Sequence, residues 1–173
     1  MSDIRPDLME DAQRRFARLY NVRDMLSRRE GGAVCAGRLY AHVLGGEDGR
    51  VESLLKSDLA VRRTYRTLLQ KSALVHMKQA VAASSQAYPE RHAQGWRLRL
   101  QVSRAQSDQL YLILEMNDQR GKVAQTLHMF GPDDTIVRLA LPAARNGVIQ
   151  TIIDKESDVA RLLAEPKTEI FLR

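Results

Sequence analysis

The spacing of apolar residues along the chain changes near Gly95. Before this glycine, apolar residues recur every three to four positions, which is the spacing of one face of a helix. After it, apolar and polar residues alternate over residues 96–102, whose sequence is WRLRLQV. Alternation places one set of side chains on each face of a strand, so this segment predicts a half-buried β-strand. The pattern therefore predicts a helical N-terminal part followed by a β part.

Four helices are expected in the N-terminal part. The first covers residues 7–29 and ends before two glycines, and the second covers residues 34–44 and ends at a second glycine pair. A short third helix is expected at residues 48–56. Asp58 is a suitable N-cap for a long fourth helix that runs through Ala83.

The C-terminal part reads as a series of short strands separated by turn residues. A polar linker containing Pro89 and Gly95 is expected at residues 84–95. The strands are expected at residues 96–104, 109–116, 122–129, 135–141, 148–153 and 167–173. Residues 154–164 form either a short helix or a loop. Short strands with regular turns are typical of a small antiparallel sandwich or barrel.

The sequence therefore predicts an α+β protein in which about four helices precede an antiparallel β-sandwich or barrel of about six strands. The expected division is a helical region at residues 1–83, a linker at residues 84–95 and an antiparallel β domain at residues 96–173. Each helix carries an apolar stripe, so the helices should pack on each other or on the sheet.

Composition adds an expectation about the compartment. The 173 residues include one cysteine, Cys35, so no intramolecular disulfide can form. The charged N-terminal stretch lacks the apolar region of a signal peptide, and no stretch approaches the ~20 apolar residues of a membrane span. We expect a cytoplasmic protein that does not enter a membrane.

The net charge of +6 is unevenly distributed. Residues 50–104 contain eleven Lys and Arg against three acidic residues, a local surplus of eight positive charges. Such a surplus favours an acidic partner, either nucleic acid or an acidic protein surface. A solvated basic face with no such partner is the simpler interpretation of the same surplus. Arg62, Arg63 and Arg66 fall within about one turn of the fourth helix, but the low aromatic content of 5% gives little support for base stacking.

No catalytic motif accompanies this pattern. The sequence lacks the phosphate loop, the dinucleotide-binding glycine motif, the nucleophile elbow and the zinc-protease helix. Cys35 and His42 would lie about 10 Å apart on one helix, too far for a nucleophile and its base. The other histidines, His76, His92 and His128, show no ligand spacing. We therefore expect no enzyme activity, no metal and no cofactor.

One stretch resembles a known family. Residues 39–48 read LYAHVLGGED, residues 51–55 read VESLL and residues 58–62 read DLAVR. This arrangement of helices and turns, over about residues 39–75, resembles the N-terminal helical segment of anti-sigma factors and related FecR-like regulators. The resemblance implies a regulator that binds a sigma factor or another regulatory protein. The zinc-binding members use a His-x-x-x-Cys-x-x-Cys motif, which is missing here, so only a zinc-less version is implied.

The leading functional prediction is a non-enzymatic regulatory or adaptor module that binds another protein through its helical part. The expected contact residues are Leu55, Arg62, Arg63, Tyr65, Arg66 and Leu69. They combine apolar positions with a basic flank, and Arg is favoured at interfaces. The β domain would serve as a scaffold or a second contact surface. Two alternatives stay open: a nucleic-acid-binding protein that uses the basic surface of residues 50–104, and an enzyme with an unrecognised site.

Overall fold

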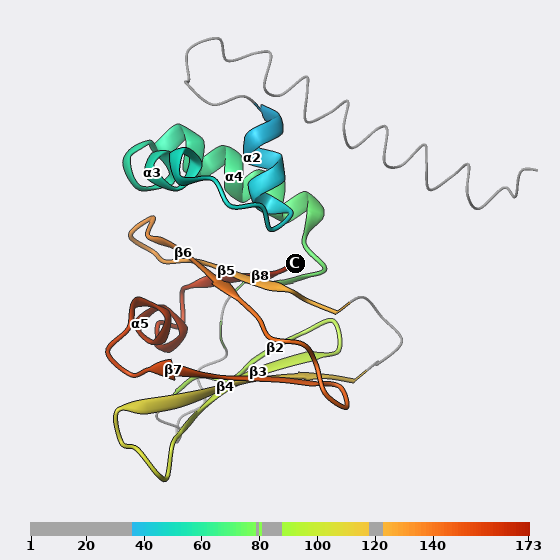
Figure 1. Ribbon diagram of the computed structural model, residues 1–173, viewed down its shortest axis with the longest axis vertical. Helices are drawn as coiled ribbons and strands as arrows, with labels where there is room; N and C mark the ends of the chain where they lie inside the picture. Colours follow the sequence, from blue (N-terminus) through green and yellow to red (C-terminus); the bar gives the residue numbers. More distant parts are fainter. Residues whose placement is uncertain (1–35, 79, 81–87, 118–122) are drawn as a thin grey trace, which may run out of the picture.

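Three of the helices gather on one side of a pair of β-sheets (Figure 1). The computed structural model describes residues 36–78, 80, 88–117 and 123–173. The expected helix at residues 7–29 and Cys35 lie outside these described residues.

Along the described chain, three helices come first, seven strands follow, and a fourth helix precedes the last strand. The helices are α2 (Ala36–Val43), α3 (Gly49–Ser57), α4 (Leu59–Ser72) and α5 (Asp158–Ala164). The strands are β1 (Val75–Met77), β2 (Arg91–Ala93), β3 (Trp96–Val102), β4 (Gln109–Met116), β5 (Thr126–Phe130), β6 (Ile136–Ala140), β7 (Val148–Asp154) and β8 (Glu169–Leu172).

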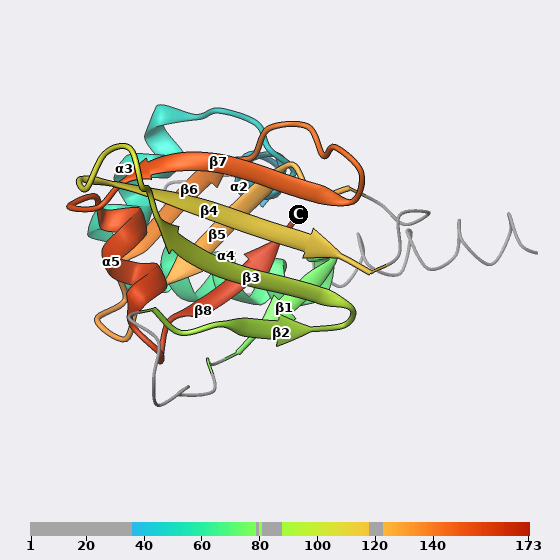
Figure 2. The ribbon, with the colours of Figure 1, turned by 90° about the horizontal axis from the view of Figure 1, so that it is seen from below.

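The strands form two antiparallel sheets of four strands each. Sheet A has the order β1-β8-β5-β6 and sheet B has the order β2-β3-β4-β7. Figure 2 shows them as successive layers, with sheet B nearer to the viewer. The expected α+β class with antiparallel strands is confirmed at this level, and the described strands do not close into a barrel.

Local sequence signals explain where α3 and α4 begin. The Asp48 carboxylate accepts hydrogen bonds from the amides of Arg50 and Val51 at the start of α3. Asp58 does the same at the start of α4, which confirms its expected role as an N-cap. Such caps satisfy amides that have no partner within the helix. Arg38 holds Asp48 through two contacts of 2.7 and 2.9 Å, and this bond lowers the pKa of the Asp48 carboxyl.

Two elements differ from the sequence prediction. The helix expected to continue through Ala83 ends at Ser72, because the chain turns to extended backbone at Ala73 and enters β1, which pairs with β8. The expected linker at 84–95 contains β2, which pairs with β3. Both strands add to the sheets, so there are eight described strands where about six were expected.

An inner core fills the space between the two sheets. Its buried members are Val75, Met77, Leu98, Leu110, Leu112, Leu114, Ala124, Leu127, Met129, Ile149, Ile153, Ala160, Leu162, Leu163, Ile170 and Leu172. They come from both sheets, from α5 and, in the case of Ala124, from the segment before β5, and all are aliphatic or methionine. The alternation of β3 and β4 therefore directs one face of sheet B inward, as in the register pair Leu98 and Leu114.

An outer core lies on the opposite face of sheet A, under α2, α3 and α4. Its buried members are Leu39, Val43, Val51, Leu55, Tyr65, Leu68, Leu69, Phe130 and Phe171. Phe130 and Phe171 meet edge to face with ring centroids 5.6 Å apart. All five residues of β5 are buried, because this strand has an apolar layer on each side.

A buried arginine joins β2 to the end of α5. Arg91 is 1% exposed, and its guanidinium donates to the main-chain oxygens of Thr168 at 2.8 Å and Glu165 at 2.7 Å. Burial lowers its pKa to about 10, so it remains charged at neutral pH. These carbonyls follow the C-terminus of α5, where a helix favours positive charge.

Candidate functional site

A large hollow runs between the helical layer and β6. It has a volume of about 840 Å³. The helical wall carries His42, Glu47, Glu52, Leu55, Lys56, Arg62 and Tyr65, and the opposite side carries Asp133, Asp134, Thr135, Ile136, Val137, Arg138, Ala140 and Asp158. We call this hollow the β6 groove.

The strand that borders this groove has a free edge. Among the described strands, β6 pairs with β5 on one side and ends the sheet on the other. The amide of Leu141 donates to the Gln125 oxygen at 2.8 Å, and this bond shows which residues of the antiparallel pair are hydrogen-bonded to each other. Bonded and outward-pointing positions alternate along such a ladder. The amide and carbonyl groups of Ile136, Arg138 and Ala140 therefore point away from β5, toward the free edge.

Arg138 ties β6 to the turn between α2 and α3. Its guanidinium donates to the main-chain oxygens of Gly46 at 2.7 Å and Gly45 at 3.1 Å. Gly46 needs to be a glycine, since a Cβ there would lie 2.9 Å from the Ala41 oxygen. The glycine pair thus ends α2 and offers its carbonyls to Arg138. The same guanidinium lies 3.4 Å from the buried ring of His42, whose pKa is lowered by burial and then by Arg138.

A chain of buried hydrogen bonds runs behind the groove. The Tyr65 hydroxyl lies 3.1 Å from Nδ1 of His128, and Nε2 of His128 lies 3.1 Å from the Thr126 hydroxyl. Thr126 donates onward to the main-chain oxygen of Arg173 at 3.3 Å. Thr126 therefore accepts from Nε2–H of His128, and Nδ1 accepts from Tyr65. Each member of this chain has a partner.

Burial keeps the members of this chain neutral. His128 is 0% exposed and Tyr65 is 1% exposed. Burial, reinforced by Arg138, lowers the pKa of His128 to about 3. Burial also raises the pKa of Tyr65 well above its usual range. At neutral pH the tyrosine keeps its proton and the imidazole stays uncharged. The series of hydrogen bonds through Tyr65, His128 and Thr126 therefore holds the helices in register with sheet A.

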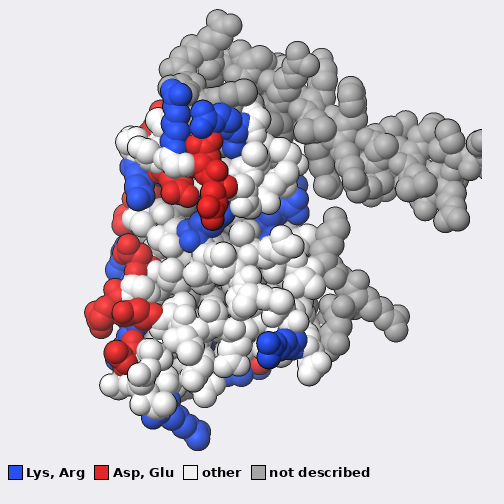
Figure 3. Space-filling view, in the orientation of Figure 1, with Lys and Arg blue, Asp and Glu red and all other residues white. Residues whose placement is uncertain are grey.

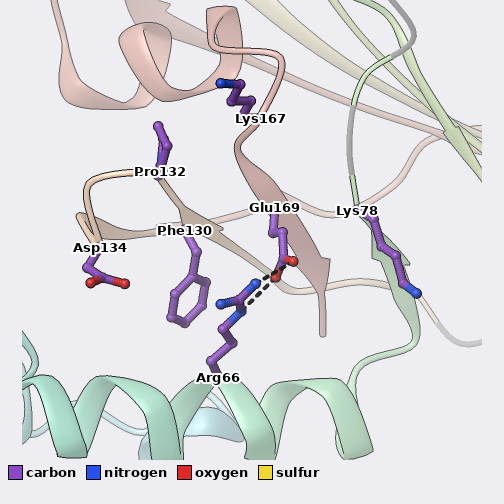
Figure 4. Close-up of a pocket in the computed structure, with 8 residues that line it drawn as sticks. Arg66, Lys78, Phe130, Pro132, Asp134, Lys167 and Glu169 are labelled. Carbon is purple, nitrogen blue, oxygen red and sulfur yellow. Dashed lines mark hydrogen bonds and ion pairs between the residues drawn. The ribbon is translucent and has the colours of Figure 1, made fainter.

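A second, smaller pocket of about 550 Å³ lies between α4 and the ends of β5 and β8 (Figure 4). The Arg66 guanidinium reaches across it and binds both carboxylate oxygens of Glu169. This bond raises the pKa of Arg66. Lys78 and Lys167 line the same pocket from separate elements. Because Glu169 occupies the fork of Arg66, this pocket presents a completed ion pair and not a vacant anion site.

Acidic side chains dominate the lining of the β6 groove. Five lining residues are acidic, namely Glu47, Glu52, Asp133, Asp134 and Asp158, and three are Lys or Arg. Two of the three basic groups are bound internally: Arg138 to the α2–α3 turn, and Arg62 to the Lys56 carbonyl at 3.0 Å. Figure 3 shows red side chains over the α2–α3 region and down the side that carries the β5–β6 turn and α5. The groove is therefore electrostatically suited to a basic ligand.

The structure places the predicted apolar contact residues inside the protein. Leu55, Tyr65 and Leu69 are 7%, 1% and 0% exposed and belong to the outer core. Their side chains cover sheet A, so they cannot present an apolar stripe to a partner while α4 stays packed. Leu55 and Tyr65 also reach the wall of the β6 groove.

The three predicted arginines have different surroundings. Arg62 caps the carbonyls at the end of α3, and Arg66 binds Glu169 from the neighbouring sheet. Arg63 is exposed on α4. The three side chains therefore do not form one contact surface: Arg62 lines the β6 groove and Arg66 lines the smaller pocket.

The basic residues of the segment 50–104 likewise lie in different surroundings and not on one surface. Arg91 is buried, Arg97 binds Glu90 at 2.9 Å, and Arg99 lies 3.1 Å from Glu115. Much of the surplus is thus engaged within the protein. The basic surface of the nucleic-acid alternative is divided among several faces of the described structure.

The described residues contain no group of three or more His, Cys, Asp or Glu side chains arranged to hold a metal ion. None of the described helices combines the length and the apolar character needed to cross a membrane. Comparisons with protein-family models, curated proteins and solved structures gave no significant match.

Proposed function

We propose that this chain is a non-enzymatic regulatory or adaptor module that binds another protein through the β6 groove. The observation that carries the proposal is a free strand edge that borders a large groove. Natural proteins usually protect such edges with charges, prolines or covering segments, because an exposed edge invites pairing. The single charge of β6, Arg138, is turned toward the carbonyls of the α2–α3 turn and does not guard the edge.

The chemistry behind the groove supports binding and not catalysis. A proton-transfer site needs a group whose pKa lies near the working pH. Here burial moves the pKa of His128 down and that of Tyr65 up, away from neutrality. The polar atoms of both side chains are also engaged in hydrogen bonds within the protein.

The resemblance over about residues 39–75 suggests where to look for the partner. This segment includes α3 and the α2–α3 turn, which form the helical wall of the groove. A sigma factor is therefore the first class of partner to test, and other regulatory proteins come next.

Site-directed photo-crosslinking in the native host tests the proposal. The photo-reactive amino acid p-benzoylphenylalanine replaces Glu52, an exposed residue of the groove wall, and in a matched control it replaces Asp108, an exposed residue outside the groove. We expect a defined protein to be crosslinked from position 52 and not from position 108. No crosslinked protein from position 52, or the same set from both positions, would contradict the proposal.

A further inference from the structure

We propose that the occupant of the β6 groove is an extended, lysine- or arginine-bearing segment of the partner, which adds to β6 as a fifth strand of sheet A. This inference rests on the proposed function and gives it a binding mode. An extended peptide can gain main-chain hydrogen bonds at a sheet edge, while its alternate side chains give selectivity.

The main chain of β6 has amide and carbonyl groups that an added strand could bond. The hydrogen bonds on the two sides of β5 agree on which groups of β6 are free. Leu141 donates to Gln125, on the β6 side, and Thr126 exchanges bonds with Arg173, on the β8 side. Odd-numbered residues of β5 therefore bond to β6 and even-numbered ones to β8. The outward groups of β6 consequently belong to Ile136, Arg138 and Ala140.

The groove reaches the edge itself and not only one face of the strand. Ile136 and Arg138 direct their side chains toward the helices, whereas Val137 packs against the inner core. All three line the same hollow. The hollow also touches Asp158 of α5, which packs on the other face of sheet A, so it extends past the strand edge from one face of the sheet to the other. Five residues of β6 span about 17 Å, which fits a peptide segment of similar length.

The walls determine the charge of that segment. A peptide paired with β6 would point alternate side chains toward Glu47 in the α2–α3 turn and Glu52 in α3, both of which are exposed. On the other side it would approach Asp158 at the start of α5. Acidic groups on both sides favour a peptide with basic residues and disfavour nucleic acid, whose phosphates they would repel.

A defined probe tests this mode with the full chain. The probe is a fluorescein-labelled pentapeptide of alternating Lys and Val, measured by fluorescence anisotropy at low ionic strength. One matched peptide has N-methyl groups on the amides that would face β6, which removes those donors and keeps every side chain. A second matched peptide replaces Lys with Glu. We expect the parent peptide to bind about tenfold more tightly than the N-methylated one, and the Glu peptide not to bind.

Protein variants test the same contact from the other side. Ala140→Pro removes an amide that points outward, so it should leave the pairing with β5 in place and weaken binding about tenfold. Ala140→Val keeps the amide and serves as its matched control. The double variant Glu47→Gln/Glu52→Gln should weaken binding, while Asp108→Asn/Glu156→Gln, with the same charge change outside the groove, should not. If Ala140→Pro does not fold, the N-methylated peptide on the unaltered chain carries the test.

The outcomes separate the binding mode from the proposed function. Equal binding of the parent and N-methylated peptides would overturn strand addition, as would absence of binding by the parent. Association of the chain with itself through β6, seen as loss of dimer in Ala140→Pro, would also overturn it, because the occupant would be a second copy. Crosslinking from position 52 tests protein binding independently of all three results.

Discussion

The two faces of sheet A are packed in different ways. The inner core, toward sheet B, contains only aliphatic and methionine side chains among its buried members. The outer core, toward the helices, contains the aromatic rings of Tyr65, Phe130 and Phe171, beside the buried histidines His42 and His128. Aliphatic contacts are non-directional, whereas hydrogen bonds and aromatic edges require one geometry. The inner core should therefore mainly supply stability, and the outer core should also set the shape of the β6 groove.

The largest expected effect comes from removing a ring from the outer core. Phe171 is 0% exposed, stacks on His76 with centroids 4.2 Å apart and meets Phe130 edge to face. Phe171→Ala should cost about 3–5 kcal/mol in the free energy of unfolding. Leu114→Ala in the inner core should cost about 2–5 kcal/mol. Chemical denaturation measures both.

Binding separates these two variants. After correction for the folded fraction, Phe171→Ala should weaken binding of the Lys–Val peptide, because the helical wall loses its support. Leu114→Ala should leave the affinity of the folded protein unchanged. Equal effects of the two variants on affinity would remove the functional distinction between the two cores.

Acid should weaken the outer core through His128. The pKa of this histidine falls from 6.5 to about 3 on folding, so the unfolded chain binds the proton first. Its contribution is complete above about pH 6.5 and is lost at about 1.4 kcal/mol per pH unit as the pH falls toward 3. Denaturation at pH 7, 6 and 5 measures the slope, and His128→Gln should make it shallower over this range. An unchanged slope in His128→Gln would show that other groups control the acid response.

The smallest expected effects concern helix caps on the two sides of the molecule. Asp58 caps α4 beside the groove wall, and Ser157 caps α5 beside the inner core. Asp58→Ala and Ser157→Ala should each lower stability by about 1 kcal/mol. Thermal unfolding measures these losses. A loss of stability confined to one of the two variants would contradict the similar contribution expected of the two caps.

Local signals were sufficient for part of the fold. Apolar residues at every second position from Leu110 to Met116 predicted the bounds of β4, and Asp58 predicted the start of α4. β1 was missed because the run Ala73-Leu74-Val75 continues the helical spacing without a glycine or proline to end it. β2 was missed because its three residues, Arg91–Ala93, offer no apolar alternation. β1 is decided by pairing with the distant strand β8, whereas β2 pairs with its neighbour β3 across the short turn at Gln94 and Gly95.

The site depended on information that a linear pattern does not contain. Leu55, Tyr65 and Leu69 were assigned to a partner as apolar positions beside a basic flank, whereas their side chains pack into the outer core on sheet A. One available signal was β5, whose sequence TLHMF has few polar positions and so indicates a strand covered on both faces. The free edge of β6 follows from the order of strands in the sheet, which the sequence does not specify.

Amide hydrogen exchange along β6, measured by NMR on the full chain with and without the Lys–Val peptide, tests the central claim most directly. In the free protein, the outward amides of Ile136, Arg138 and Ala140 should exchange faster than those of Val137 and Leu139, which face β5. The peptide should slow the three outward amides by about tenfold or more, in proportion to its occupancy. Bound peptide with unchanged exchange at these three amides would contradict the account.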